Sequence, residues 1–273
     1  MSRPILGAVA AALVSIAGNT TADEIRNPLI ESQTWSDLRA DVTGDRDLLP
    51  GESLFTLDAP FRAHDAATVP IRIVQTDASA ERITELSLIV DENPAPIAAT
   101  FTFGELMGRI DLETRVRVNA YSNVRALATT EDGRTFMTGR FVKASGGCSA
   151  PASKDPQVAI DTMGQMKLRH MSGLTAQSGA RIEAKLMIRH PNFSGLQRDQ
   201  VTLLTIPAHF VDEIEVRQGD DLLFRMTGGI SISEDPTFQF SYTDNGAETV
   251  HVRATDTNGG IFEATFRKAA VDG

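Results

Sequence analysis

The single cysteine of this 273-residue chain, Cys148, lies among small residues. Gly146 and Gly147 precede it, and Ser149 follows it. A thiolate can attack a sulfur atom to form an S–S bond, and the thiolate is regenerated when that bond is cleaved. Small residues let a backbone bend freely and enter a narrow site. The pattern predicts that Cys148 is an exposed, mobile attachment point for covalent cargo, carried on a flexible arm of Gly146, Gly147 and Ser149.

A buried position is the alternative for Cys148, because a free cysteine commonly behaves as a small hydrophobic residue. Only Ala150 among its near neighbours is apolar, and burial would enclose glycine-rich backbone whose amides need hydrogen-bond partners. With one cysteine, no internal disulfide can form. The nearest basic residues in sequence are Lys143 and Lys154. We therefore expect a thiol with an ordinary pKa of about 8.5, whose reactivity depends on access.

Two histidines, His190 and His209, are the other candidates for chemistry. Two histidines without a third placed ligand fall short of a zinc site, so we interpret both as structural, with metal binding as the alternative. The sequence contains no Gly-x-Ser-x-Gly, His-Glu-x-x-His or Cys-x-x-Cys motif and no phosphate-binding glycine loop. We predict that the protein is not an enzyme and that it has no catalytic residues, no cofactor and no metal.

The elements that must position these residues are predicted to be strands. Short runs rich in Val, Ile, Thr and Phe alternate with Pro, Asp, Asn and Gly. A short helix is expected from Pro28 through Leu38, ended by Gly44. In the first half, strands are predicted at Leu54–Leu57, Val69–Gln75, Ile83–Val90, Ile97–Phe103, Glu113–Thr130 and Arg134–Lys143. In the second half, they are predicted from Met166 and at Arg181–His190, Ile214–Arg217, Leu222–Met226, Phe238–Tyr242, Thr249–Thr255 and Ile261–Phe266.

The fold class that this pattern favours is all-β, with two tandem immunoglobulin-like β-sandwich domains that pack together and a short N-terminal helix after a signal peptide. Residues 1–22 form the signal, with cleavage expected after Ala22 and a buried N-terminal helix as the alternative. The first sandwich is assigned to residues 23–148, a linker to 149–165 and the second sandwich to 166–270. A cleaved signal predicts an exported, periplasmic protein.

The charge of the chain excludes some classes of partner. It contains 36 acidic and 26 basic side chains, for a formal net charge of −10. Binding to nucleic acid or to anionic lipid depends largely on Lys and Arg. We therefore expect neither nucleic acid nor a membrane as a partner.

Several ordered motifs resemble two known families. Those of the first half are similar to SoxY, and they are Ile89-Val90-Asp91-Glu92-Asn93-Pro94, Thr114-Arg115-Val116-Arg117-Val118, Ser122-Asn123-Val124 and Gly146-Gly147-Cys148. Those of the second half are similar to SoxZ, and they are Ile188-Arg189-His190-Pro191, Ile206-Pro207-Ala208-His209-Phe210 and Ser233-Glu234-Asp235-Pro236. With both halves in one chain, the protein resembles the fused SoxYZ-like carriers associated with quinoprotein dehydrogenases.

This resemblance implies that Cys148 carries sulfur intermediates as an S–S adduct between periplasmic enzymes during thiosulfate oxidation, with the SoxZ-like half as permanent partner. The partners expected are periplasmic sulfur-oxidation enzymes or a quinoprotein dehydrogenase system. In SoxY the cysteine lies at the extreme C-terminus, whereas here Ser149-Ala150-Pro151 follow and the chain continues. The arm is therefore tethered at both ends. The alternative function is a non-carrier accessory or binding protein for a periplasmic quinoprotein dehydrogenase.

Overall fold

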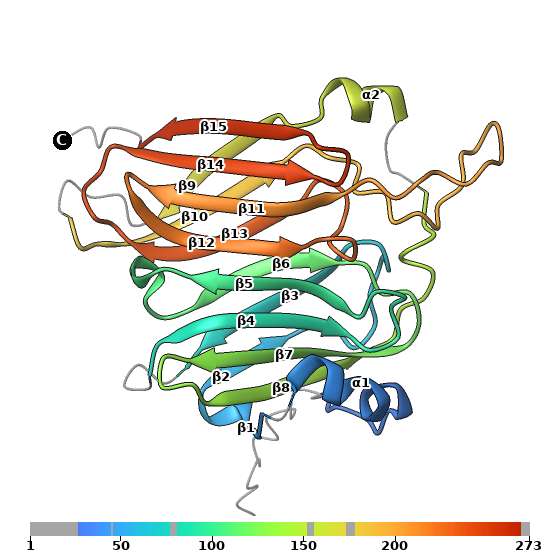
Figure 1. The fold of residues 1–273 in the computed structure, drawn as a ribbon, viewed down its shortest axis with the longest axis horizontal. Helices are drawn as coiled ribbons and strands as arrows, with labels where there is room; N and C mark the ends of the chain where they lie inside the picture. Colours follow the sequence, from blue (N-terminus) through green and yellow to red (C-terminus); the bar gives the residue numbers. More distant parts are fainter. Residues whose placement is uncertain (1–26, 45, 77–80, 152–155, 173–177, 269–273) are drawn as a thin grey trace, which may run out of the picture.

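The computed structural model describes residues 27–44, 46–76, 81–151, 156–172 and 178–268. Its core is a sandwich of two β-sheets, with the first half of the chain at one end and the second half at the other (Figure 1). The all-β prediction is confirmed. The predicted signal peptide, residues 1–22, lies outside the described residues. Among the helices that are described, none is long and apolar enough to cross a membrane.

The first half contributes one helix, eight strands and two short 3-10 helices. In chain order these are α1 (Gln33–Thr43), β1 (Leu48–Pro50), η1 (Gly51–Ser53), β2 (Phe55–Asp58), β3 (Val69–Gln75), β4 (Ile83–Val90), β5 (Ile97–Phe103), η2 (Glu105–Met107), β6 (Asp111–Val116), β7 (Ser122–Thr130) and β8 (Thr135–Val142). The predicted strands of this half are present, except that residues 113–130 form two strands in place of one, and β1 is an addition.

The second half contributes seven strands after one short helix. In chain order these are α2 (Pro156–Asp161), β9 (Met166–Ser172), β10 (Arg181–Ile188), β11 (Val211–Gln218), β12 (Asp221–Gly228), β13 (Thr237–Thr243), β14 (Thr249–Asp256) and β15 (Ile261–Arg267). The helix α2 lies within the predicted linker 149–165. Strand β10 alternates as expected, since Ile182, Ala184, Leu186 and Ile188 are all fully buried.

The two halves share both sheets, which the sequence did not indicate. One sheet has the strand order β1-β8-β7-β4-β5-β12-β11-β14-β15, and the other has the order β2-β3-β6-β13-β10-β9. The halves meet where β5 pairs antiparallel with β12 and where β6 pairs antiparallel with β13. The tandem sandwiches therefore join edge to edge, because pairing the edge strands satisfies main-chain groups that an open edge would leave exposed.

A single hydrophobic core runs through this junction. Phe101 of β5 lies 6.1 Å from Phe224 of β12 and 6.0 Å from Phe238 of β13, measured between ring centroids. All three rings are fully buried. Burial of these aromatic side chains against one another stabilises the packing of the two halves.

One predicted strand is wrong in its length. Residues 113–130 were predicted to form one continuous strand, but β6 ends at Val116 and β7 begins only at Ser122. The strand β6 ends because Arg117, the next residue, no longer pairs with β3. Its amide donates instead to the carbonyl of Ser231 in the second half, at 2.7 Å. Arg117 is consequently buried, with 1% of its surface exposed.

The N-terminal helix begins later than predicted. Ser32 is its N-cap and accepts from the Trp35 amide, and Gly44 ends it in a left-handed conformation with φ 58°. The helix packs over a buried ion pair of the sheet, in which Arg125 of β7 binds Asp91 at 2.8 Å. The same guanidinium lies 4.3 Å from the ring centroid of Trp35.

The shared sheets make a direct prediction about the joined halves. A specific protease site inserted between Pro151 and Pro156 should allow the linker to be cut, and the two fragments should still elute together in native buffer. Main-chain pairing and one common core hold them, so they should separate only in denaturant. Uncut protein with the same insertion is the control. Fragments that elute apart in native buffer would contradict the shared fold.

Candidate functional site

Cys148 lies in a tight turn six residues after the end of β8. The Ser149 amide donates to the Gly146 carbonyl at 3.2 Å and closes this turn. The Gly146 and Gly147 amides donate to the carbonyls of Asn119 and Val118, at 2.8 and 3.0 Å. The cysteine is buried, with 3% of its surface exposed. The turn is thus fixed to the segment between β6 and β7.

The two glycines have a different role from the one predicted. Gly146 adopts a left-handed conformation with φ 77°, which favours glycine. Gly147 packs so closely that a Cβ there would lie 2.1 Å from the Ala66 carbonyl oxygen. The glycines therefore permit a compact turn and a close backbone approach. They do not form a flexible arm in this structure.

The prediction that Cys148 is exposed is wrong for this structure. Of the predicted arm, Gly147 is buried, Gly146 is half-buried and only Ser149 is exposed. The expectation used neighbours in sequence, whereas the residues that enclose Cys148 come from elsewhere in the chain. The buried backbone amides of the turn are not left without partners, because they donate to the carbonyls of Asn119 and Val118.

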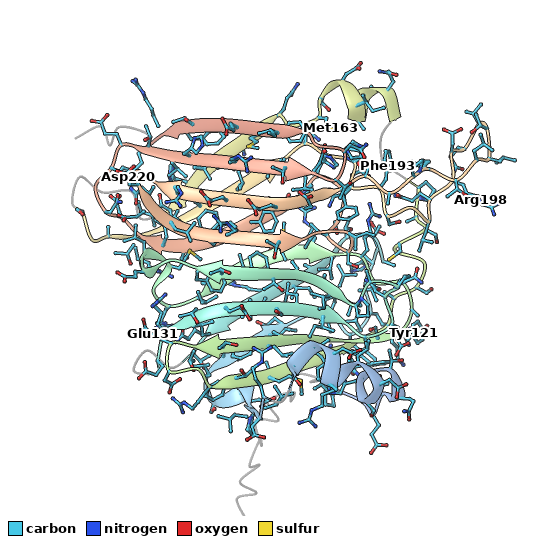
Figure 2. All side chains as sticks on the ribbon, viewed as in Figure 1. Tyr121, Glu131, Met163, Phe193, Arg198 and Asp220 are labelled. Carbon is cyan, nitrogen blue, oxygen red and sulfur yellow. The ribbon has the colours of Figure 1, made fainter. Side chains whose placement is uncertain are left out.

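A loop of the second half covers the turn. Ser194 Oγ donates to the Cys148 carbonyl, and Gln197 Nε2 donates to the Ala150 carbonyl at 3.0 Å. Both residues are buried. We call residues 194–206 the clamp loop. Figure 2 shows that the part of this loop carrying Arg198 projects beyond the sandwich, at the end where Phe193 and Tyr121 lie.

The outer part of the clamp loop is apolar and exposed. Val201 is 91% exposed to solvent, and Leu203 and Leu204 are 70% and 69% exposed. Leu203 also adopts a positive φ of 59°, which is uncommon for a side chain of its size. The base of the loop therefore holds the cysteine turn, while its tip presents apolar surface to solvent.

Arg117 is a buried charged residue that contacts the cysteine turn. Its Nη1 donates to the Gly147 carbonyl at 3.1 Å, and its Nη2 donates to the Asn192 carbonyl at 3.3 Å. The guanidinium therefore bridges the cysteine turn and the second half. Burial lowers the pKa of Arg117 from its usual value, while Cys148, Glu234 and Asp65 act in the opposite direction.

The thiol of Cys148 experiences two opposing effects. Burial raises its pKa, because a thiolate loses solvation there, and the positive charge of Arg117 lowers it. The net direction is a raised pKa, so the buried thiol is neutral at neutral pH. The expected ordinary pKa is therefore corrected, since neither the burial nor the cation is visible from the nearest basic residues in sequence.

Asn192 connects the cysteine turn to the second half. It is fully buried and has a positive φ of 45°. Its side-chain amide donates to the carbonyls of Gly229 and Ile232, both at 3.2 Å, and its side-chain oxygen accepts from the Val211 amide at 3.1 Å. Its main-chain carbonyl accepts from Arg117. The residue thus joins several loops into one polar network.

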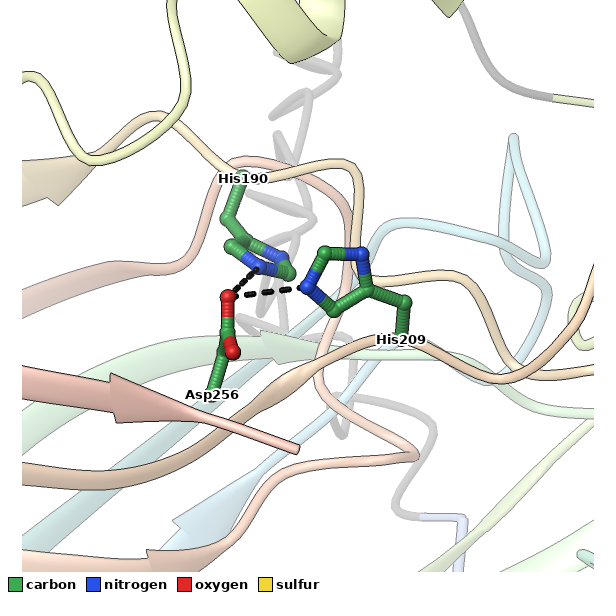
Figure 3. A group of neighbouring side chains, drawn as sticks. All are labelled: His190, His209 and Asp256. Atoms are coloured by element: carbon green, nitrogen blue, oxygen red, sulfur yellow. Dashed lines mark hydrogen bonds and ion pairs between the residues drawn. The ribbon is translucent and has the colours of Figure 1, made fainter. Parts of the chain in front are cut away.

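The histidines converge on a carboxylate that the sequence did not single out. His190 Nε2 and His209 Nε2 lie 3.4 and 2.8 Å from the same oxygen of Asp256 (Figure 3). One ligand atom from each of the three residues falls within 4.8 Å of the others. The other oxygen of Asp256 accepts from the Asn258 and Gly260 amides, at 2.9 and 2.7 Å.

The hydrogen bonds around His190 favour the structural interpretation over a metal site. Its Nδ1 accepts from the Asn192 amide at 3.1 Å, which places the ring proton of the neutral form on Nε2. That nitrogen then donates to Asp256 and has no lone pair for a metal. Burial, followed by the charge of His209, lowers the pKa of His190. A neutral His190 therefore links Asp256 to Asn192.

Three residues of this site escaped the sequence analysis. Arg117 belongs to a motif quoted for the SoxY resemblance, but no role was predicted for it. Asn192 follows the motif that ends in Pro191, and Asp256 precedes the turn at Asn258-Gly259-Gly260. Arg117 continues the alternation with Val116 and Val118, so the sequence gives no signal of its burial, whereas the Asn directly after His-Pro is a signal for Asn192.

The fold and the site define a class: an all-β protein of two joined halves, with one cysteine held in a turn where they meet. Residues 39–148 match the family model described as sulfur oxidation protein SoxY, and residues 171–267 match that of sulphur oxidation protein SoxZ. The SoxY match ends on Cys148. The chain therefore belongs to these families as a SoxYZ-like fusion, with a SoxY domain followed by a SoxZ domain.

Similarity to solved structures is distant. The sulfur carrier protein SoxY from Chlorobium limicola f thiosulfatophilum is 20% identical, with a TM-score of 0.33, over 42% of this chain and 100% of that chain. A β-glycosidase from Bacteroides vulgatus is 8% identical, with a TM-score of 0.23, over 78% of this chain and 24% of that chain. No curated protein matches the chain.

The clamp contacts predict how fast Cys148 reacts. Labelling of the folded protein by a thiol reagent should be slow, and Ser194→Ala or Gln197→Ala should speed it by roughly five- to tenfold. Each variant removes one hydrogen bond to the turn, which contributes about 1 kcal/mol to keeping the turn closed, and one bond within the clamp loop. Ser178→Ala, which removes a bond to the Asp244 carbonyl instead, should leave the rate unchanged. Wild-type labelling as fast as that of unfolded protein would refute the clamp.

The histidine cluster predicts a loss of stability in acid. The pKa of His190 is lowered on folding, so the unfolded chain takes up a proton below about pH 6.5 that the folded protein excludes. The free energy of unfolding should fall by about 1 kcal/mol for this residue between pH 7.5 and pH 5.5. Burial also lowers the pKa of His170, which adds to the loss.

Urea unfolding at both pH values measures this effect, and His190→Asn isolates it. Asn retains an oxygen for the Asn192 amide but does not titrate, so the variant should show the smaller difference between the two pH values. Equal differences in wild type and variant would show that His190 is not the responsible group.

Proposed function

We propose that this protein is an exported sulfur-compound carrier that holds intermediates as an S–S adduct on Cys148. The observation that supports the proposal most is the coincidence of three features at one residue. The SoxY match ends on Cys148, the chain has no other cysteine, and the SoxZ half contacts the cysteine turn through Ser194 and Gln197. A periplasmic location follows from the expected signal peptide, cleaved after Ala22.

Loading and unloading are thiol chemistry that needs no catalytic group of this chain. The thiolate of Cys148 attacks an electrophilic sulfur of the donor, a new S–S bond forms and the leaving group departs with the electron pair. Because burial favours the neutral thiol, the turn must open before this attack. We therefore assign no enzymatic activity to the chain, and sulfur-oxidation enzymes or a quinoprotein dehydrogenase system act as its partners.

The clamp loop provides a route by which a partner enzyme exposes Cys148. Its tip offers the apolar side chains of Val201, Leu203 and Leu204 to a partner, and its base holds the cysteine turn. A partner that binds the tip and displaces the loop breaks the two clamp bonds at the same time. Access to the thiol then depends on docking.

A second function is favoured by the burial of Cys148. A cysteine that is 3% exposed is also what an accessory or binding protein for a periplasmic quinoprotein dehydrogenase would have, with the thiol never loaded. The two functions differ in what is attached to the cysteine in the cell.

The intact mass of protein isolated from its native periplasm, after growth on reduced sulfur compounds, distinguishes the two functions. A carrier should show a fraction of molecules with added sulfur-containing mass, removed by a reductant and located on Cys148 by peptide mapping. Cys148→Ser expressed in the same host should lack it. An unmodified mass under all such conditions would leave the accessory function.

A further inference from the structure

One buried side-chain donor in the described part of the chain has no hydrogen-bond partner, and it belongs to Arg117. The orphan atom is Nε. The residue is 1% exposed, so bulk solvent does not reach it. Leaving a buried N–H of a charged group unsatisfied is costly, and such groups are rare in folded proteins. The orphan therefore calls for an explanation specific to this position.

Arg117 also forms no close ion pair with any described residue, although the more distant charges of Glu234 and Asp65 raise its pKa. The ion pairs between described residues do not include it. Arg125, the other buried arginine of this half, differs because it binds Asp91 at 2.8 Å. The guanidinium of Arg117 meets only the neutral carbonyls of Gly147 and Asn192. A buried cation bound only by carbonyls can still accept an anion.

Arg117 is directed at the cysteine turn. It binds the carbonyl of Gly147, which belongs to the peptide unit that joins Gly147 to Cys148. The guanidinium and the thiol also affect each other's ionisation, which places them within electrostatic reach. A neutral thiol is only a weak acceptor, so it does not satisfy the guanidinium. An oxyanion attached to the sulfur would supply both a negative charge and several acceptors.

We propose that Arg117 and Cys148 together form a binding site for an anionic adduct, in which Arg117 recognises the oxyanion of a sulfonate-type group bound to the Cys148 sulfur. The inference rests on the proposed carrier function for its biological meaning. What it adds is the residue of this chain that recognises the cargo, Arg117. A neutral or cationic adduct would leave the Nε donor unsatisfied or place a second cation beside it.

Chemically loaded adducts of opposite type test this site. Tetrathionate gives the anionic adduct: the Cys148 thiolate attacks a central sulfur, the central S–S bond breaks, thiosulfate leaves with the electron pair and –S–S₂O₃⁻ remains on the protein. Methyl methanethiosulfonate gives the neutral adduct –S–SCH₃, with methanesulfinate as leaving group. In both reactions the thiol is oxidised and its proton passes to solvent. The full chain is loaded in urea, refolded and checked by intact mass.

The thermal midpoint of each adduct is the measurement. In wild type, the anionic adduct should melt about 3 °C or more above the neutral one, since one charge-assisted hydrogen bond contributes on that scale in a chain of this size. In Arg117→Gln this difference should vanish. Arg181→Gln is the matched control, because Arg181 also donates to main-chain carbonyls between the halves, those of Met107 and Arg109. That variant should keep the difference.

Two outcomes would overturn the site: equal midpoints for the two adducts in wild type, or a difference that persists in Arg117→Gln. If Arg117→Gln does not refold, Arg117→Lys and the wild-type pair decide, with Lys expected to retain the charge but only part of the difference. Chemical loading does not depend on any partner enzyme. If the anionic adduct is the more stable one but native protein carries no adduct, only the carrier function is overturned. If native protein carries adducts but the two midpoints are equal, only the role of Arg117 is overturned.

Discussion

The edge-to-edge pairing of β5 with β12 and of β6 with β13 is the constraint on which the site depends. Each half alone would present a row of unpaired main-chain groups at these edges, and pairing them fixes the register between the halves. That register sets the clamp loop over the cysteine turn. It also places Arg117 between Gly147 and Asn192, one residue from each half. The site therefore exists only in the joined molecule.

Burial and the neighbouring cation act on the Cys148 thiol in opposite directions, and burial is the larger effect. The resting thiol is therefore neutral, and a neutral thiol resists the oxidation that a thiolate invites. The contacts that close the turn from the clamp loop are two side-chain hydrogen bonds. Each contributes about 1 kcal/mol, which is small beside the stability of a whole domain. Releasing the clamp loop from the turn is thus much less costly than unfolding the protein.

Much of the fold follows from the sequence, because alternating apolar residues in short runs specify half-buried strands. Strand β10 and the hairpin turn at Asp132-Gly133, between β7 and β8, are examples. The joining of the sheets does not follow, since an edge strand has the same residue pattern whether its free edge faces solvent or pairs with another strand. The SoxY and SoxZ motifs predicted the domain order and identified Cys148.

The burial of the site was missed for a physical reason. Local composition describes what a segment can do by itself, and a glycine-rich turn serves either as a mobile arm or as a close-packed corner. Which of the two forms depends on groups distant in sequence. Here Ala66, Ser194 and Gln197 meet the turn. None of them is within forty residues of Cys148 in sequence, so no inspection of its neighbours reveals them.

The histidine cluster and the cysteine turn belong to one network. Asp256 accepts from His190, His190 accepts from the Asn192 amide, and the Asn192 carbonyl accepts from Arg117. These four groups are nearly fully buried, so removing any one leaves a polar atom without a partner in a medium where that is costly. Asn192 is held in its left-handed conformation by contacts on both sides. The histidines, which resemble ligands in the sequence, therefore act on the cysteine indirectly, by fixing the residue that positions Arg117.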